Sequence, residues 1–255
     1  MNFIISRTNY IPYYIPLIIE GNKSSIKSIM FLNKNKKQFV DPYNKIEELN
    51  ILKIKYNFEI KDIQDIKNYS GPTFFCEGDI VGQKDIFENT GLYHLNESHI
   101  KISLVCNYEF AMFYNQYINK VDYVIFPSKL YATTYKTLSP KNLYLGSPKY
   151  TIELNNNLNL PNDKYCILFF PKDPIKHCKN NTLYPNKEQL INIYNYLKKL
   201  NFKIIVKTRK QDPVVDPELK GDYYFEDNLY PTTSMELINI SKLIIFFSSS
   251  LVEEC

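Results

Sequence analysis

The feature that most constrains the fold is a regular alternation of short apolar runs with segments of helical length. Such runs, rich in β-branched and aromatic residues and stopped by polar turns, are typical of buried strands. In the first half of the chain we predict strands at 2–6, 28–32, 56–60, 73–76, 100–106, 121–126 and 142–145. Strands separated by helices predict a parallel sheet covered on both faces, with right-handed crossovers.

The alternation restarts after a polar, Asn-rich stretch at 153–163. Strands are predicted at 165–170, 203–206, 223–225 and 244–247, with a helix from about 187 and another beginning at Thr233. Thr233 and Glu236 have the spacing of a capping box. We therefore predict an α/β protein with a Rossmann-like domain at 1–147, a linker at 148–163 and a second Rossmann-like domain at 164–255.

Composition excludes several classes of protein. In a chain of 255 residues, 44% hydrophobic and 23% charged residues exclude disorder, and a net charge of +4 is too weak to indicate nucleic-acid binding. No apolar run approaches the ~20 residues that a membrane span requires, so any membrane contact is expected to be peripheral.

The five cysteines are widely spaced and show no metal-ligand pattern. Three lie in or beside strand-like apolar runs, which favours reduced, mostly buried thiols. We therefore expect a cytoplasmic protein without a structural metal site.

Three consecutive serines follow the last predicted strand. Ser248, Ser249 and Ser250 precede Glu253 and Glu254. Serine hydroxyls and the free N–H groups at the start of a helix can hold a phosphate at the carboxyl end of a strand. The same residues also fit a simple helix cap with acidic residues in its first turn. Taken alone, the motif favours the simple cap.

Three segments in order resemble the GT-B fold of nucleotide-sugar glycosyltransferases and their relatives, which include teichoic-acid-type glycerophosphotransferases and non-hydrolysing nucleotide-sugar 2-epimerases. They are the strand and cap at 122–128, the Gly-Pro turn at 145–150 and the serine-to-glutamate motif at 248–254. The resemblance implies two Rossmann-like domains facing a cleft, with the donor diphosphate and ribose held by Ser248 to Ser250 and by Glu253 or Glu254. It also implies a metal-independent reaction without a cofactor, in which the nucleotide-sugar is a co-substrate.

The resemblance suggests roles for four further residues. Lys207 and Arg209, which follow a predicted strand, are candidates to neutralise the leaving diphosphate. Many relatives carry a Lys-Pro-His-like sequence here, whereas this chain has Thr208 between the two basic residues. Asp79, or otherwise Glu77, is the candidate general base, because both follow a first-domain strand. Alternatively, Lys207 and Arg209 belong to a solvated strand end, and Glu77 and Asp79 belong to a polar turn.

We therefore expect a glycosyltransferase that moves a sugar from a nucleotide-activated donor to the hydroxyl of a glycan or small acceptor. A nucleotide-sugar 2-epimerase and a non-catalytic nucleotide- or partner-binding module are the alternatives. The second domain is expected to be incomplete, with at least one further βα unit in the parent sequence, because five residues after a strand cannot complete a helix. The sequence does not specify the donor sugar, nucleobase, acceptor, stereochemical course or oligomeric state.

Overall fold

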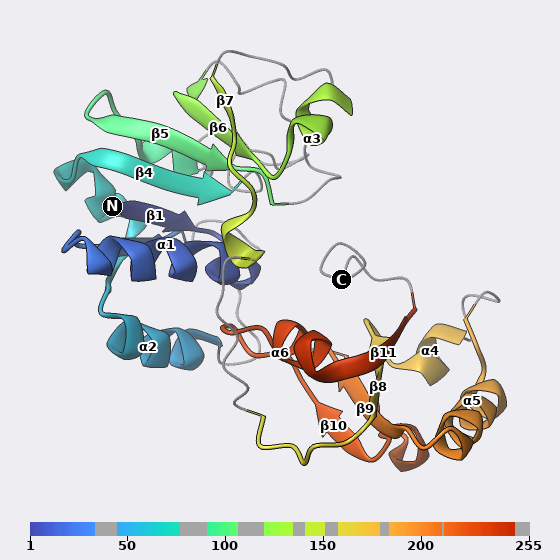
Figure 1. The fold of residues 1–255 in the computed structure, drawn as a ribbon. Coiled ribbons are helices and arrows are strands. Elements are labelled where there is room, and N and C mark those ends of the chain that lie inside the picture. Colours follow the sequence, from blue (N-terminus) through green and yellow to red (C-terminus); the bar gives the residue numbers. More distant parts are fainter. Residues whose placement is uncertain are drawn as a thin grey trace. The chain divides into compact units, whose positions relative to one another are not determined.

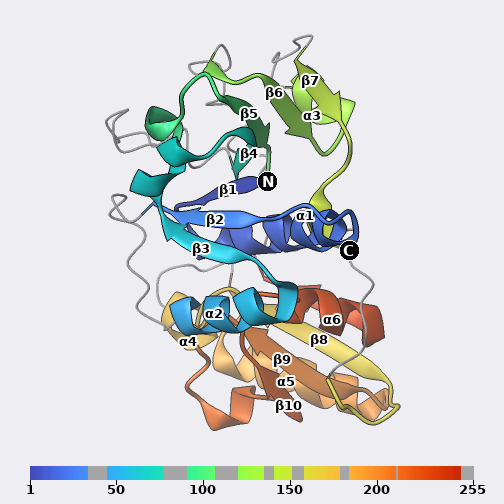
Figure 2. The same ribbon diagram turned by 90° about the vertical axis from the view of Figure 1, so that its left-hand side faces the viewer.

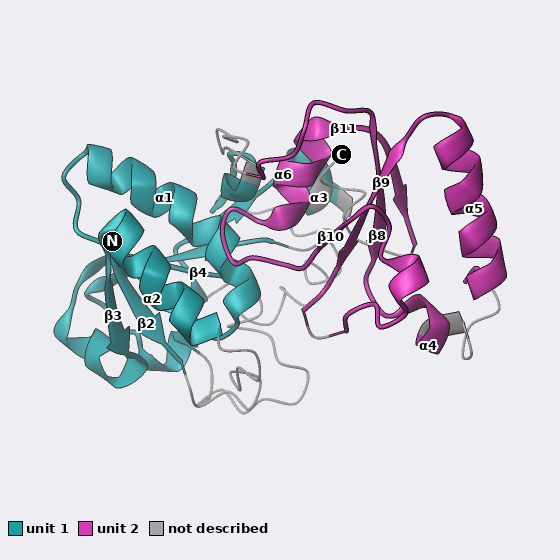
Figure 3. Ribbon diagram, turned by 90° about the horizontal axis from the view of Figure 1, so that it is seen from below, with its two compact units in different colours: residues 1–152 teal, residues 153–255 magenta. Residues whose placement is uncertain are grey.

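The computed structural model describes residues 1–33, 45–76, 91–106, 120–134, 141–150, 158–178, 184–210 and 212–247. The chain divides into two compact units, Met1–Ile152 and Glu153–Cys255, shown in different colours in Figure 3. The linker predicted at 148–163 contains the point of division. Among the described residues, no helix is long and apolar enough to cross a membrane.

The first unit is built on a seven-stranded sheet in the order β3-β2-β1-β4-β5-β6-β7, which can be followed in Figures 1 and 2. All its neighbouring strands are parallel. The strands are β1 (Asn2–Ile5), β2 (Ile29–Leu32), β3 (Glu59–Asp62), β4 (Gly71–Cys76), β5 (His99–Leu104), β6 (Tyr123–Phe126) and β7 (Asn142–Tyr144).

Helices and single turns connect these strands. They are α1 (Ile11–Lys23), α2 (Lys45–Tyr56) and α3 (Lys129–Thr134), with 3-10 turns at Thr8–Tyr10, Ile63–Asn68, Gly91–His94 and Pro148–Tyr150. Strands β1 and β2 are buried along their whole length, as expected for strands covered on both faces. Aromatic and aliphatic side chains, among them Phe31, Phe75 and Phe126, form the core on one face.

Helix α1 is tied to β1, an interior strand of the sheet. Tyr14, Ile15 and Ile18 lie on its buried face, and the Tyr14 hydroxyl donates a hydrogen bond of 2.8 Å to the carbonyl of Ile4. Helix α1 continues past Gly21 to Lys23, and Ser24 is its C-cap residue. Gly21 is a close-contact position, where an added Cβ atom would overlap Cε of Met1.

The second unit contains a four-stranded parallel sheet in the order β10-β9-β8-β11. Its strands are β8 (Tyr165–Phe170), β9 (Lys203–Thr208), β10 (Tyr223–Phe225) and β11 (Ser241–Phe246), and its helices are α4 (Pro174–Cys178), α5 (Lys187–Lys199), a 3-10 turn (Pro217–Leu219) and α6 (Thr233–Ile240). Every residue of β8 is buried. The predicted α/β class with two parallel sheets is confirmed.

The helix caps of this unit differ from the prediction. The capping box lies at the start of α5, where Asn186 and Gln189 exchange side-chain and backbone hydrogen bonds of 2.9 Å. The box predicted at Thr233 and Glu236 is wrong, because Thr232 is the N-cap residue of α6 and makes no side-chain capping bond. The Thr233 hydroxyl instead donates to the carbonyl of Glu226 over 2.7 Å.

Candidate functional site

Strand order in the second sheet creates a switch point between β8 and β11. From β8 the chain passes to β9 and β10 on one side and then returns to place β11 on the other side of β8. Strand order therefore reverses between β8 and β11. In open α/β sheets, ligands bind outside the carboxyl ends of the strands, at the point where strand order reverses. This edge is the candidate site of the second unit.

An aromatic cluster fixes the end of β11. The rings of Phe170 and Phe247 are stacked, with centroids 5.2 Å apart and an interplanar angle of 1°. The Tyr184 ring lies 5.7 Å from that of Phe247, and the Tyr184 hydroxyl donates a hydrogen bond of 2.7 Å to the Phe247 carbonyl. The backbone is thus held in place one residue before Ser248.

The ionisation of Tyr184 should be visible in the stability of the protein at high pH. Burial raises the pKa of Tyr184 from 10.0 to about 12, against the opposing effect of the Arg209 charge. Because the folded-state pKa lies above the unfolded value, the stabilisation is complete below pH 10.0 and is lost as the pH rises to about 12. The urea midpoint should therefore fall over this window, and fall less steeply for Tyr184→Phe, which has no phenol to ionise. Equal slopes for the two proteins would contradict this assignment.

Asp173 shapes the turn that leaves β8. Its carboxylate is completely buried, and one oxygen accepts a hydrogen bond of 3.0 Å from the backbone N–H of Lys176, in the first turn of α4. The other oxygen accepts one of 3.0 Å from the N–H of Val215, 42 residues further along the chain. A single side chain thus joins the β8–α4 turn to the loop between β9 and β10. The sequence analysis did not identify Asp173, although an Asp directly before Pro174 after a buried strand is a recognisable cap signal.

The two basic candidates at the end of β9 differ in exposure. Lys207 is only 5% exposed; its ammonium group pairs with Asp227 and lies 5.8 Å from the ring centroid of Phe169. Arg209 is exposed, and its carbonyl accepts a hydrogen bond of 3.0 Å from the N–H of Asp212. The guanidinium of Arg209 is therefore accessible to an anion from solvent, whereas the charge of Lys207 is compensated inside the unit.

Seven predicted site residues lie outside the described residues: Glu77, Asp79, Ser248, Ser249, Ser250, Glu253 and Glu254. In the sequence, these residues follow two of the described strands. The first pair follows Cys76, the last residue of β4, and the second group follows Phe247 at the end of β11. Strand β4 ends at a switch point of the first sheet, because its neighbour β1 is followed by β2 on one side and β4 is followed by β5 on the other. Strand β11 ends at the switch point of the second sheet.

Two polar side chains at the first switch point were not identified from the sequence. Ser6 and Arg7 directly follow β1, and Ser6 is completely buried. Neither Oγ of Ser6 nor Nε of Arg7, both buried atoms, has a hydrogen-bond partner in the part of the chain that the structure describes. Buried polar groups are usually paired, so these two atoms are candidates to meet a ligand. Their position immediately after the first strand is the sequence signal that could have identified them.

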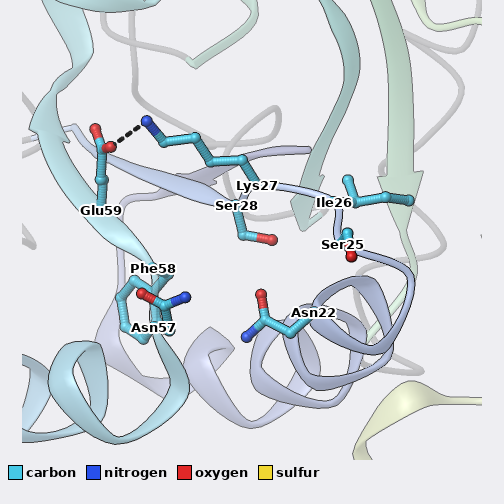
Figure 4. A pocket seen from close by; sticks show the side chains of 8 residues that line it. All are labelled: Asn22, Ser25, Ile26, Lys27, Ser28, Asn57, Phe58 and Glu59. Carbon is cyan, nitrogen blue, oxygen red and sulfur yellow. Dashed lines mark ion pairs between the residues drawn. The ribbon is translucent and has the colours of Figure 1, made fainter.

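A pocket of about 450 Å³ lies at the opposite edge of the first sheet. Figure 4 shows its lining residues, which come from the ends of α1 and α2 and the starts of β2 and β3: Asn22, Ser25, Ile26, Lys27, Ser28, Asn57, Phe58 and Glu59. Its two charged side chains, Lys27 and Glu59, form an ion pair of 2.5 Å. None of the residues predicted to act on a substrate lines this pocket.

Metal ligands do not gather in the described ranges: no group of three or more His, Cys, Asp or Glu side chains there is arranged to hold a metal ion. The candidate site of the second unit therefore consists of aromatic side chains, one buried carboxylate and one exposed guanidinium.

The succession of two parallel Rossmann-like sheets in one chain defines a GT-B-type fold, and the resemblance predicted from the sequence is confirmed at this level. Two single-residue variants of the wall teichoic acid polymerase TagF superpose with TM-scores of 0.58 and 0.56 at 15% and 16% identity. Each alignment covers 98% of this chain and 66% of the polymerase chain, so the protein spans about two thirds of that length.

A third similar solved structure is that of a protein with a different assigned activity. A protein assigned as a UDP-N-acetylglucosamine 2-epimerase, from Listeria monocytogenes, superposes with a TM-score of 0.50 at 9% identity, covering 98% of this chain and 74% of its own. No protein-family model matches the sequence, and no curated protein matches it significantly. At these identities the structural likeness defines the fold and leaves the activity to be argued from the site.

Proposed function

We propose that the chain is a transferase that binds a nucleotide-activated donor at the carboxyl edge of its second sheet and moves the activated sugar, or a related polyol phosphate group, to an acceptor hydroxyl. The observation that carries this proposal is the switch point between β8 and β11. The Ser248 to Ser250 run follows β11 in the sequence, and α/β folds hold phosphates just beyond the carboxyl ends of strands at such a point.

The proposed roles follow from charge and position. Ser248, Ser249 and Ser250 bind the diphosphate, and Glu253 or Glu254 accepts hydrogen bonds from the ribose hydroxyls. Arg209, exposed at the end of the neighbouring strand β9, offsets the charge that develops on the leaving diphosphate.

On the first unit, Asp79 is the proposed general base for the acceptor hydroxyl and Glu77 the alternative. Both follow β4, and Ser6 and Arg7 follow the adjacent strand β1, where their unpaired polar atoms are available to position a polar acceptor. The displacement at the anomeric carbon proceeds without a metal, because side chains and N–H dipoles supply the positive potential. The proposed location is the cytoplasm.

Two other functions fit the same fold. The likeness to the UDP-N-acetylglucosamine 2-epimerase favours epimerisation as the second enzymatic candidate. The pairing of Lys207 with Asp227 inside the second unit favours a non-catalytic nucleotide-binding module, because it leaves one exposed cation at the end of β9. Binding and product measurements on the same protein separate the three candidates.

Calorimetric titration of the full chain with UDP, CDP and GDP, each alone and as the nucleotide-sugar, tests the donor site. We expect one nucleotide to bind, and Arg209→Ala to weaken its binding about tenfold or more, because a charge-assisted hydrogen bond contributes roughly 1.5–3 kcal/mol. Ser249→Ala and Glu254→Ala should weaken it too. Lys203→Ala is the matched control, since Lys203 is an exposed cation at the opposite end of the same strand. Absence of binding by every nucleotide, with all variants equal to wild type, would refute the proposal.

Product analysis then distinguishes the candidates. A transferred group on an added acceptor supports the transferase, and Asp79→Asn should lower its rate while leaving nucleotide affinity unchanged. A changed sugar configuration without an acceptor would identify an epimerase. Tight binding with neither product would identify the non-catalytic module.

A further inference from the structure

Two cysteines from different strands meet at the carboxyl edge of the first sheet. Cys76 is the last residue of β4 and is completely buried. Cys106 follows β5, which pairs with β4 so that Cys76 lies opposite Leu104. The two Sγ atoms are 3.1 Å apart, and both cysteines are in the thiol form. The sequence analysis treated these cysteines as separate buried thiols, because 30 positions separate them in the chain.

The pair is asymmetric in the way that disulfide exchange requires. Cys106 is partly exposed, so a small disulfide in solution can reach it, whereas Cys76 is completely buried and its sulfur lies 3.1 Å from that of Cys106. The backbone at Cys106 is held by the Tyr13 hydroxyl, which donates a hydrogen bond of 3.0 Å to the Cys106 carbonyl. The thiol of Cys106 is therefore positioned to react first with a small disulfide, and the thiol of Cys76 is positioned to resolve the mixed disulfide that forms.

We propose that Cys76 and Cys106 form a redox-active dithiol that small-molecule disulfides, such as oxidised glutathione, convert to an intramolecular disulfide. The Cys106 thiolate attacks one sulfur of the small disulfide, which forms a mixed disulfide and releases one thiolate. The Cys76 thiolate then attacks the Cys106 sulfur, which forms the protein disulfide and releases the second small thiolate. The protein loses two protons and two electrons: the electrons reduce the sulfur–sulfur bond of the small disulfide, and the two thiolates that it releases take up the protons.

The geometry requires little rearrangement. The two sulfurs must approach by about 1 Å to reach the length of a disulfide bond. The product would join the ends of β4 and β5 and enclose the segment that contains Glu77 and Asp79. The inference does not depend on the proposed transferase, because its test measures thiols and not transfer.

Cys166 is the natural internal control. It lies in β8 of the second unit and is completely buried, and burial raises its pKa to about 11. A small disulfide in solution cannot react first with a completely buried thiol, and Cys166 is in a different unit from Cys76 and Cys106. Cys166→Ser should therefore not change the oxidation of the first unit.

The experiment equilibrates the full chain with a series of ratios of oxidised to reduced glutathione, blocks remaining thiols with an alkylating reagent and maps linked peptides by mass spectrometry. We expect the Cys76–Cys106 linkage to become at least ~10-fold more abundant than any other disulfide. The oxidised protein should melt roughly 5 °C higher, because the bond closes a long loop. Cys166→Ser should behave as wild type.

Single variants test the order of the two steps. In Cys76→Ser, glutathione should remain attached to Cys106, because the resolving thiol is missing. In Cys106→Ser, Cys76 should resist modification, because it is buried. Cys76→Ala is the second variant if serine disturbs folding, and far-UV circular dichroism checks both. Stable glutathione on Cys106 of the wild type, a dominant linkage through another cysteine, or no linkage at any ratio would overturn the proposal.

Discussion

Asp173→Ala is expected to lower the free energy of unfolding of the second unit by about 3 kcal/mol, since it removes two hydrogen bonds to a buried charged acceptor. The substitution leaves the backbone N–H groups of Lys176 and Val215 without the carboxylate oxygens that now accept from them at 3.0 Å. The first loss uncaps α4 and the second releases the loop between β9 and β10 from the β8 turn. Urea unfolding followed by far-UV circular dichroism measures the change.

Two comparisons make the Asp173 prediction specific. Asp163→Ala removes an exposed carboxylate before the start of β8 and should change stability by less than about 0.5 kcal/mol. Asp173→Asn keeps one carbonyl oxygen as an acceptor and should lie between alanine and wild type. Because Asp173 positions the turn at the candidate donor edge, nucleotide affinity should fall in the same order. A loss no larger for Asp173→Ala than for Asp163→Ala would contradict the structural role.

Strands buried on both faces were the most predictable elements. The apolar run at 165–170 was predicted with the same bounds as β8. All six residues of this strand are buried, so the change from apolar to polar residues marks its ends. Strand β3 was predicted at 56–60, whereas the structure has Glu59–Asp62. This strand is at the edge of the sheet and partly exposed, so its sequence is charged, and Tyr56 completes α2 instead. Edge strands lack the apolar signal on which such predictions depend.

Contacts between distant residues limited the prediction of the site. A serine run after a strand is a local motif and was identified, but the ion pair of Lys207 with Asp227 joins two strand ends 20 residues apart. The Asp173–Val215 hydrogen bond and the Cys76–Cys106 contact span 42 and 30 residues. Each depends on strand order, which places residues from separate βα units at one sheet edge. A single sequence shows which residues end the strands but not which strands are neighbours.

Lys207→Met is expected to lower the free energy of unfolding of the second unit by about 2 kcal/mol, less than the roughly 3–5 kcal/mol that breaking a fully buried pair costs. We expect this smaller loss of stability because the ion pair is partly exposed: the Lys207 side chain is 6% exposed and that of Asp227 is 29% exposed. The unpaired Asp227 therefore keeps part of its hydration. Asp227→Asn should cost more than an average surface substitution, because it removes the negative charge that compensates the more deeply buried ammonium group of Lys207.

A double-mutant cycle separates pairing from ligand binding. If the role of Lys207 is to pair with Asp227, the double variant Lys207→Met/Asp227→Asn should be about 1–2 kcal/mol more stable than the sum of the two single losses predicts. Nucleotide affinity should then fall less in Lys207→Met than in Arg209→Ala. The sequence suggested that Lys207 or Arg209 neutralises the leaving diphosphate. Neutralisation by Lys207 requires Lys207→Met to lower nucleotide affinity at least as much as Arg209→Ala does. Equal and large affinity losses without coupling to Asp227 would assign Lys207 to the ligand, since a charge committed to a ligand has no reason to stabilise the unliganded unit.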